Sequence, residues 1–223
     1  MNKINVLVLA AGQGTRFKSY TNTPKPLISI KGEPMYQHVL NNLNIKNPCD
    51  IHVLFHKDYK CTTPYITHTI DHYTEGAAES AFNVISKIPS EPWLIMDCDA
   101  VIETTPITFD KSSILIDNVQ VFDPRASYSY IKGGKILCTA EKQVISKYRN
   151  IGAYFWEKGS IFCDAFQIAK KFKYKVNNEY YISPLYNIAI SNGLDVFPVF
   201  VERFTPIGVP EDLERYLNEI NRT

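Results

Sequence analysis

The chain has 223 residues, 45% of them hydrophobic, which is enough for one α/β domain with a packed core. Its 24 basic residues nearly balance its 23 acidic ones, so no overall positive field exists to hold DNA or RNA, and nucleic acid is not an expected partner. The five cysteines are odd in number and form no CxxC pair, which argues against a disulfide framework and against a zinc site.

No stretch of the chain has the length of a membrane-spanning helix. Apolar runs such as Ile4 to Leu9 fall far short of the roughly 20 residues that a span requires, and no basic segment with a cleavable apolar stretch precedes them. We therefore expect an unprocessed cytoplasmic protein with reduced thiols and no membrane contact. A homo-oligomer is compatible with the sequence.

The first half of the chain alternates strand and helix patterns. The run Ile4 to Leu9 is short, apolar and rich in β-branched residues, as expected for a central strand buried on both faces of a parallel sheet. The next predicted elements are a helix over Pro34 to Leu43, strands over Ile51 to Phe55 and Ile66 to Tyr73, a helix over Ala77 to Ile88 and a strand over Trp93 to Met96. This order favours a doubly wound sheet, in which ligands bind beyond the carboxyl ends of the strands.

The second half predicts a partly antiparallel sheet. Its expected elements are strands over Ile114 to Phe122, Ser127 to Ile131, Lys135 to Ala140 and Ile151 to Trp156, helices over Ser160 to Phe172 and Ser183 to Ser191, a strand over Asp195 to Val201 and a helix from Pro210. Gly133-Gly134 is a two-residue hairpin turn. The predicted fold is therefore a single α/β domain with a Rossmann-like mixed sheet, mainly parallel, with helices on both faces and an antiparallel part in the second half.

A glycine-rich turn follows the first strand. Residues Leu9 to Arg16 read Leu-Ala-Ala-Gly-Gln-Gly-Thr-Arg, and Pro24-Lys25-Pro26-Leu27 comes shortly after. Glycines let the backbone approach a ligand without a Cβ clash, so that N–H groups can converge on phosphate oxygens. Arg16 adds a planar fork for two phosphate oxygens, and Lys25 adds a cation between two prolines. The turn is typical of a polyphosphate site, although the third glycine of a dinucleotide fingerprint and the Gly-Lys-Ser/Thr of a P-loop are absent.

Two carboxylates, Asp97 and Asp99, follow the strand that begins at Trp93. Residues two apart on a strand point the same way, so both are expected to face one cation in the ligand crevice. Hard oxygen ligands suit Mg²⁺, which also binds substrate phosphates. Exposed strand-end acids are the alternative, but the glycine turn in the same chain favours a metal.

Other catalytic patterns are weak. His68 and His72 lie four apart, but the surrounding alternation predicts a strand and no HExxH motif is present, so both are expected to be structural. No Ser/His/Asp or Cys/His set accompanies the glycine turn, which argues against a covalent enzyme intermediate. The lysines clustered at positions 170, 171, 173 and 175 are interpreted as a solvated helix end.

The glycine turn and the segments after it resemble the sugar-phosphate nucleotidyltransferases, a family with a Rossmann-like sheet of GT-A type. Leu9 to Leu27 is similar to the opening motif LAAGxGTRxxxxTxxxPKPL, with Thr23 close to its spacer threonine. The resemblance extends through Glu75-Gly76-Ala77-Ala78, Asp97-Cys98-Asp99, Glu141-Lys142, Asn150 to Tyr154, Glu179-Tyr180 and Gly208 to Asp212. The short form with its DxD pattern is similar to cytidylyltransferases of capsule and lipopolysaccharide pathways.

The resemblance implies an NTP-binding half over residues 1–110, an acceptor-binding half over residues 111–223, and Mg²⁺ as cofactor. Nucleotide contacts are implied for Leu9, Ala11, Gly12, Gly14, Thr15, Glu75 and Gly76, the last letting the base pack on the backbone. Catalytic roles are implied for Arg16 on the NTP phosphates, Lys25 near the reacting phosphate and Lys142 on the acceptor phosphate. Acceptor contacts are implied for Glu141, Gly152 and Glu179, and metal ligation for Asp97 and Asp99.

Some positions leave alternatives open. Many family members have an acid before the glycine of Gly-Thr-Pro-Glu-Asp, where this chain has Pro206-Ile207-Gly208. Asp97 is favoured as the replacing ligand, with Glu202, or substrate and water, as alternatives. A surface ion pair is the alternative for Glu141-Lys142, and helix capping is the alternative for Glu179.

The implied reaction transfers a nucleoside monophosphate from an NTP, with CTP favoured, to a small phosphorylated acceptor and releases pyrophosphate. The acceptor is expected to be a sugar phosphate or another polar metabolite phosphate used for surface polysaccharide. A GT-A glycosyltransferase shares the sheet and the DxD pattern but would not explain GxGTR with PKPL. A non-catalytic nucleotide-sensing domain is the other rival, because the second family acid is missing.

Overall fold

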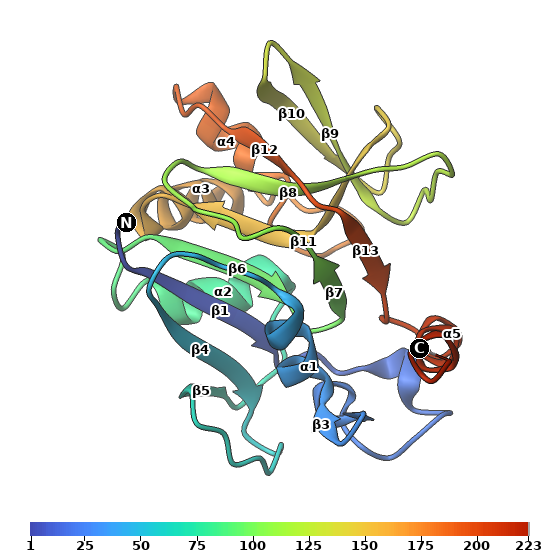
Figure 1. Cartoon of the computed structure of the whole chain (residues 1–223). Coiled ribbons are helices and arrows are strands. Elements are labelled where there is room, and N and C mark those ends of the chain that lie inside the picture. Colours follow the sequence, from blue (N-terminus) through green and yellow to red (C-terminus); the bar gives the residue numbers. More distant parts are fainter. Residues whose placement is uncertain (223) are drawn as a thin grey trace.

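A mixed sheet of nine strands runs through the centre of residues 1–222, the part of the chain that the computed structural model describes (Figure 1). Its strands are β1 (Ile4–Ala10), β4 (Cys49–His56), β5 (Ile66–Ile70), β6 (Trp93–Asp97), β8 (Ser113–Asn118), β9 (Ser127–Lys132), β10 (Lys135–Glu141), β11 (Tyr148–Trp156) and β12 (Phe197–Phe200). They lie in the order β10-β9-β11-β6-β1-β4-β5, with β8 beside β11 and β12 beside β8.

The sheet is parallel around its first strand and largely antiparallel beyond β6. Strand β1 pairs in parallel with β4 and β6, and β4 pairs in parallel with β5. Strand β11 then runs antiparallel to β6, β8 and β9, whereas β12 is parallel to β8. The predicted α/β fold with a mixed sheet and a central first strand is confirmed.

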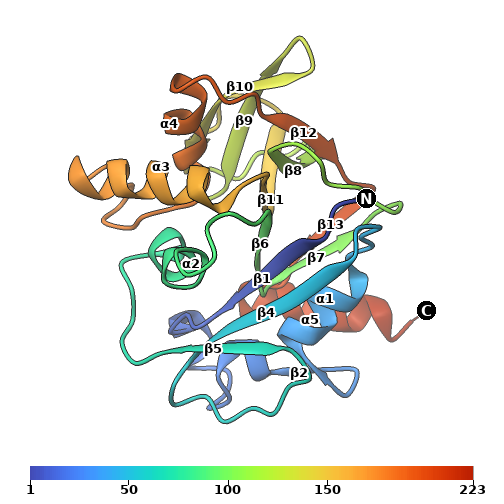
Figure 2. The same ribbon diagram turned by 90° about the vertical axis from the view of Figure 1, so that its left-hand side faces the viewer.

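Helices cover both faces of the sheet. They are α1 (Met35–Asn42), α2 (Ala77–Ile85), α3 (Gly159–Lys171), α4 (Leu185–Ser191) and α5 (Pro210–Ile220). Figure 2 shows α2 and α3 on the opposite side of the sheet from α1 and α5. Alternate side chains of β1 point to the two faces. Ile4, Val6 and Val8 therefore join a hydrophobic cluster with α1 and α5, and Leu7 joins a second cluster with α2 and α3.

Several elements were predicted to extend further toward the C-terminus than they do. The strand expected to reach Phe122 ends at Asn118, the strand expected to reach Tyr73 ends at Ile70, and the helix expected to reach Ile88 ends at Ile85. After Asn118 the backbone N–H of Val119 bonds to Lys147, and the chain then leaves the sheet in a loop. The hairpin turn is confirmed, since both glycines have positive φ angles, 62° at Gly133 and 76° at Gly134.

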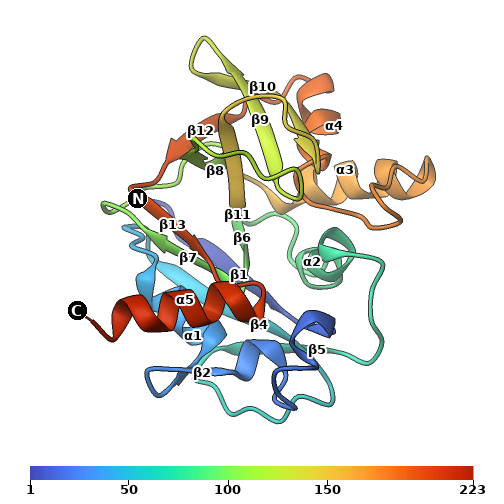
Figure 3. The ribbon, with the colours of Figure 1, turned by 90° about the vertical axis from the view of Figure 1, so that its right-hand side faces the viewer.

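Two small antiparallel pairs were not predicted. Strand β7 (Ala100–Glu103) pairs with β13 (Arg203–Pro206), and β2 (Ser29–Ile30) pairs with β3 (Glu33–Pro34). Figure 3 shows β13 beside β7, with α5 below the two strands in this view. The first pair brings the segment before α5 to the end of β6, where the N–H of Ile207 bonds to the carbonyl of Asp99 at 2.9 Å. Among the helices of residues 1–222, none combines the length and apolar character that a membrane span needs.

Candidate active site

A cavity of about 670 Å³ opens at the carboxyl ends of β1 and β6. A doubly wound sheet places its ligand crevice at this edge. The cavity collects most residues that the sequence singled out, namely Leu9, Ala11, Gly12, Gly14, Thr15, Arg16, Lys25, Glu75, Gly76, Asp97, Asp99 and Glu179. It also includes residues that sequence reasoning missed, among them Tyr73, Ser80, Asn178, Tyr181 and Gly208.

The glycine turn is held in one shape by its neighbours. Gly14 has φ 58°, and a Cβ there would lie 2.9 Å from the Cβ of Lys25, so only glycine fits. The short 3₁₀ turn Thr15–Phe17 follows, and Phe17 is buried beneath it. On the other side the hydroxyl of Tyr59 donates a hydrogen bond of 2.8 Å to the carbonyl of Gly12. These contacts anchor the turn and leave Arg16 at the cavity wall.

Asp97 and Asp99 both face the cavity, but only Asp97 belongs to β6. Strand β6 ends at Asp97, and Asp99 lies in the following turn. The alternation of side chains along a strand, from which both carboxylates were predicted to face one cation, therefore does not apply to Asp99. Each carboxylate lies against a glycine instead. A Cβ at Gly152 would come within 2.6 Å of Asp97 Oδ2, and one at Gly208 within 2.7 Å of Asp99 Oδ2. Gly152 thus makes room for an acid of the site without lining the cavity.

Lys25 forms an ion pair with Asp99 in which both side chains are largely buried. Burial alone would raise the pKa of Asp99, but the charge of Lys25 and its hydrogen bond hold that pKa below its ordinary value. For Lys25, burial would lower the pKa, but the charge of Asp99, its hydrogen bond and the nearby Cys98 and Asp97 together raise the pKa above its ordinary value. Burial raises the pKa of Asp97 to about 7, and the nearby charge of Asp99 adds to the rise. Of the two carboxylates, Asp97 therefore depends more on a further cation to be ionised.

The donor set of this acidic pair fits Mg²⁺. Two carboxylates at a cavity edge match the preference of Mg²⁺ for one or two protein carboxylates completed by substrate phosphates and water. Within residues 1–222 no group of three or more His, Cys, Asp or Glu side chains forms a larger metal cluster. Glu202 lies beside Glu103, at the opposite end of the β7–β13 ladder from Asp99. It does not line the cavity, which argues against Glu202 as the second ligand.

Gly76 is fixed by protein packing. Its φ is 134°, and a Cβ there would lie 2.5 Å from the carbonyl oxygen of Tyr180. The N–H of Tyr180 bonds to Glu75 at 2.7 Å, and its carbonyl accepts a bond of 3.0 Å from Ala78. The start of α2 is thereby joined to the segment before α4. This contact requires glycine at position 76 independently of any base that packs on it.

Glu141 sits at the end of a buried polar chain. Its carboxylate accepts a 2.8 Å hydrogen bond from Ser183, which accepts one of 2.8 Å from Ser127, which in turn accepts one of 2.7 Å from Asn150. Burial raises the pKa of Glu141, although the bond from Ser183 works against the rise. The charge of Lys142 also works against the rise, but the carboxylate of Glu141 is hydrogen-bonded inside the protein to Ser183, which argues against a simple surface ion pair.

Lys142 has a left-handed backbone, with φ 56°, that non-glycine residues rarely adopt. Its N–H bonds to the carbonyl of Ala126 at 2.9 Å, and its ammonium lies 4.8 Å from the centre of the Tyr181 ring. Tyr181 lines the cavity, whereas Glu141 and Lys142 do not. Lys142 therefore stands at the edge of the cavity, behind an aromatic ring of its wall.

Glu179 lines the same wall as Tyr181. Burial raises the pKa of Tyr181, and a hydrogen bond with Glu179 adds to the rise. Helix α4 begins only at Leu185, so Glu179 is too far from its first turn to cap it, and the capping alternative does not hold.

One of the two histidines expected to be structural, His68, packs against the buried His52, whereas the other, His72, lies on the surface. His52 is buried on β4, with Nε2 3.1 Å from Asn5 Oδ1 and Nδ1 2.9 Å from His68 Nε2, and the two rings stack. Asn5 Oδ1 can only accept, so His52 donates to it and accepts from His68, which suits two neutral rings. His72 is exposed and contacts Asp71.

This pairing predicts a loss of stability in mild acid. Burial lowers the pKa of His52 to about 4, and the charge of His68 adds to the lowering, whereas an unfolded histidine has a pKa of about 6.5. Between about pH 6.5 and pH 4, His52 therefore binds a proton in the unfolded chain but not in the folded chain. The free energy of unfolding should fall in this range by up to about 1.4 kcal/mol per pH unit through this group.

Urea unfolding of the wild type, His52→Gln and His72→Gln at several pH values tests this expectation. The slope should flatten in His52→Gln and stay unchanged in His72→Gln, the control in which an exposed histidine is removed. Parallel profiles for the wild type and His52→Gln would mean that His52 takes up its proton equally in both states.

Part of the chain matches a known domain family, and all of it matches solved structures. Residues 6–107 match the family described as MobA-like NTP transferase domain. Over 89 residues the chain is 38% identical to the bifunctional protein GlmU of Tropheryma whipplei, covering 38% of this chain and 14% of that protein. The chain thus spans only a small part of the curated relatives that it matches.

Two solved structures are similar over their whole length. The nucleoside-diphosphate-sugar pyrophosphorylase from Vibrio cholerae RC9 has a TM-score of 0.80 and 18% identity, covering 96% of this chain and 100% of that chain. The inositol-1-phosphate CTP transferase from T. maritima has a TM-score of 0.70 and 16% identity, covering 99% and 97%. At these identities the likeness establishes the fold, a single α/β domain with a mixed sheet.

Proposed function

We propose that this chain is a nucleotidyltransferase that moves a nucleoside monophosphate from an NTP to a small phosphorylated acceptor and releases pyrophosphate. The observation that carries the proposal is the content of one cavity. There the glycine turn, Arg16, the Lys25–Asp99 ion pair and the half-buried Asp97 meet at the carboxyl edge of a parallel sheet. The match of residues 6–107 to an NTP transferase domain supports the same reaction class.

The transfer is an in-line displacement at the α-phosphorus. An oxygen of the acceptor phosphate bonds to the α-phosphorus, the bond from that phosphorus to the oxygen bridging to the β-phosphate breaks, and pyrophosphate leaves with the electron pair. Because the attacking oxygen is already ionised, no general base is required. The protein must instead hold two anions together and offset their repulsion.

The basic side chains divide this task. Arg16, beside the glycine turn, holds the NTP phosphates with its planar fork. Lys25 lies between the turn and the acids, where its ammonium stabilises the negative charge that shifts during displacement. Lys142, at the edge of the cavity beside Tyr181, holds the acceptor phosphate. Asp97 and Asp99 would hold Mg²⁺, which when bound would neutralise phosphate charge in the cavity.

We propose CTP as the nucleotide, and a sugar phosphate or another polar metabolite phosphate for surface polysaccharide as the acceptor. The Asp97-Cys98-Asp99 pattern supports CTP by its resemblance to cytidylyltransferases, and one structural neighbour carries CTP transferase in its name. Other neighbours are named UDP-glucose pyrophosphorylase, which makes UTP the competing choice.

Lys142→Ala is expected to separate the two substrates. A hydrogen bond to a charged group is worth about 1.5 to 3 kcal/mol, so the KM for the acceptor should rise by roughly 10- to 100-fold while NTP affinity stays unchanged. Steady-state pyrophosphate release and calorimetric NTP binding measure the two effects.

Lys147→Ala is the matched control, because Lys147 also carries its ammonium over a tyrosine ring, 5.5 Å from the centre of Tyr148. It should leave both constants unchanged. Loss of NTP binding with normal acceptor dependence in Lys142→Ala would place Lys142 on the nucleotide instead.

The proposal is tested by a pyrophosphate-release screen that crosses the four NTPs with sugar 1-phosphates, phosphocholine, glycerol 3-phosphate and other phosphorylated metabolites, with Mg²⁺ present. A transferase releases pyrophosphate only with a matching pair. A glycosyltransferase would consume a nucleotide sugar without releasing pyrophosphate, and a nucleotide sensor would bind an NTP without turnover. Binding of NTP with no release from any pair would therefore contradict the proposal.

A further inference from the structure

The main cavity carries too little positive charge for two anionic substrates. Among its lining residues within 1–222, only Arg16 and Lys25 are basic, whereas Glu75, Asp97, Asp99 and Glu179 are acidic. Lys25 is already paired with Asp99. An acceptor phosphate that enters beside an NTP therefore depends on cations that reach the cavity from its rim, and Lys142 is the first of these.

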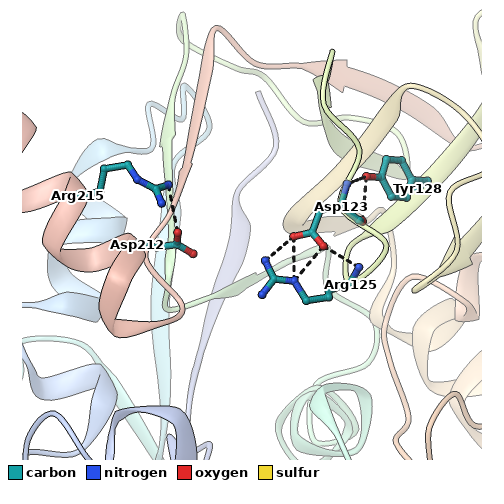
Figure 4. Close-up of polar contacts among 5 residues, drawn as sticks. All are labelled: Asp123, Arg125, Tyr128, Asp212 and Arg215. Carbon is teal, nitrogen blue, oxygen red and sulfur yellow. Dashed lines mark hydrogen bonds and ion pairs between the residues drawn. The ribbon is translucent and has the colours of Figure 1, made fainter.

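A second cation, Arg125, stands on the loop between β8 and β9. Within residues 1–222 the guanidinium hydrogen-bonds only to Asp123, two residues earlier, through Nε at 3.0 Å from Oδ1 and Nη2 at 2.8 Å from Oδ2, and the charge of Asp212 also acts on it. Three of its five N–H groups have no protein partner among residues 1–222, and the side chain is 76% exposed. Figure 4 shows Arg125 in the open space between this loop and the first turn of α5, which carries Asp212.

The loop that carries Arg125 is fixed rather than loose. The carboxylate of Asp123 accepts a 2.8 Å bond from the N–H of Arg125, and the N–H of Asp123 bonds at 2.8 Å to the hydroxyl of the buried Tyr128. The Tyr128 hydroxyl in turn donates to the carbonyl of Asp123 at 3.1 Å. Asp123 therefore presents Arg125 in a set orientation, which lowers the entropy cost of binding an anion.

Arg125 and Lys142 also share a backbone connection. Ala126, next to Arg125, accepts the hydrogen bond of 2.9 Å from the N–H of Lys142, the residue with the left-handed backbone. Strained residues of this kind persist where the surrounding structure determines them, and they concentrate at functional sites. This bond continues the β9–β10 ladder, in which Ser127 pairs with Glu141, and it holds the loop of Arg125 beside Lys142. The first turn of α5, which Arg125 faces in Figure 4, comes directly after Gly208, a residue that lines the cavity.

We propose that Arg125 is a second phosphate-binding residue of the acceptor site, acting with Lys142 on the phosphate group of the acceptor. The inference rests on the proposed transferase function and deepens it. Arg125 supplies the free edge of its planar fork, which matches two oxygens of a phosphomonoester, whereas Lys142 supplies a point charge. Phosphorylated acceptors are thereby preferred over neutral analogues such as free sugars.

Calorimetric titration of inorganic phosphate tests the inference without turnover. Inorganic phosphate is the probe because every phosphorylated acceptor shares this group, and the glycine turn is first filled with the non-hydrolysable analogue α,β-methylene-CTP. Phosphate should bind Arg125→Ala about 10-fold more weakly than the wild type, while the affinity for the CTP analogue is unchanged. Arg215→Ala is the matched control, because Arg215 is equally exposed and pairs only with the nearby Asp212; its phosphate affinity should equal that of the wild type.

Three results would overturn the inference: equal phosphate affinity in Arg125→Ala and the wild type, no phosphate binding to the wild type, or an equal loss in Asp212→Asn. An equal loss in Asp212→Asn would mean that Arg125 acts by reaching across to α5 rather than by binding an anion.

The proposed function can be rejected independently of this inference. Phosphate binding that depends on Arg125 without pyrophosphate release from any pair would reject only the transferase reaction, and pyrophosphate release that is indifferent to Arg125→Ala would reject only this residue's role.

Discussion

Asp99→Asn is expected to reduce turnover by on the order of 10²- to 10³-fold, because asparagine keeps the shape of the side chain but loses the charge. Lys25 holds the pKa of Asp99 below its ordinary value, so this carboxylate carries a charge in the folded protein and can contribute to binding a cation. The loss should appear in kcat for pyrophosphate release at saturating substrates and Mg²⁺. Mn²⁺ titration should also detect weaker cation binding, independently of activity.

Stability must be measured alongside, since Asp99→Asn leaves the largely buried Lys25 without its charge partner. Breaking such a pair costs about 3 to 5 kcal/mol, whereas a domain has about 5 to 15 kcal/mol of net stability, so the variant should stay folded at low temperature. Asp195→Asn removes the acid of a comparable Asp–Lys pair, Lys135–Asp195, on the exposed surface, and it should retain full turnover. Near-normal turnover and Mn²⁺ affinity in Asp99→Asn would remove Asp99 from the metal site.

Lys25→Ala is expected to lower kcat by on the order of 10²-fold while changing NTP affinity by only a few fold. Lys25 lies between the glycine turn and the acidic pair, so its ammonium should matter most when charge shifts from the α-phosphorus to the leaving pyrophosphate. An interaction made mainly in the transition state affects kcat rather than binding. Pre-steady-state pyrophosphate release and calorimetric NTP binding measure the two quantities.

Lys18→Ala is the control for Lys25→Ala, because Lys18 is an exposed lysine of the same segment that does not line the cavity. It should leave both kcat and NTP affinity unchanged. A kcat of Lys25→Ala equal to that of the wild type would contradict the assignment. A proportional loss of NTP affinity would instead make Lys25 a ground-state phosphate ligand.

The sequence predicted the parts of the fold that local patterns determine. The β-branched run at Ile4 and the double glycine at Gly133 each carry their own signal, since burial period and turn chemistry are properties of neighbouring residues. The glycine turn was predicted for the same reason. Gly14 lies close against Lys25, so the contact that requires glycine is made within the same motif.

The parts that the sequence did not predict depend on residues far apart in the chain. The residues near Asp99 give no signal that β7 pairs with β13 and brings Gly208 against the Asp99 carboxylate. The ion pair between Lys25 and Asp99 joins two motifs that were assigned separate roles. Arg125 was missed because it lies outside every recognised motif, and the pairing of β9 with β10, continued by the bond from Lys142 to Ala126, places its loop beside Lys142.

A nucleoside monophosphate is expected to pass from the NTP to the phosphorylated acceptor in one direct step. Two radioactive labels test this with the active substrate pair, one in the α-phosphate and one in the γ-phosphate of the NTP. The α-label should appear in the acceptor product and the γ-label in pyrophosphate, in equal amounts, with no label retained on the protein. Release of the γ-label as inorganic phosphate, or an α-label that stays covalently on the protein when the acceptor is omitted, would contradict this expectation.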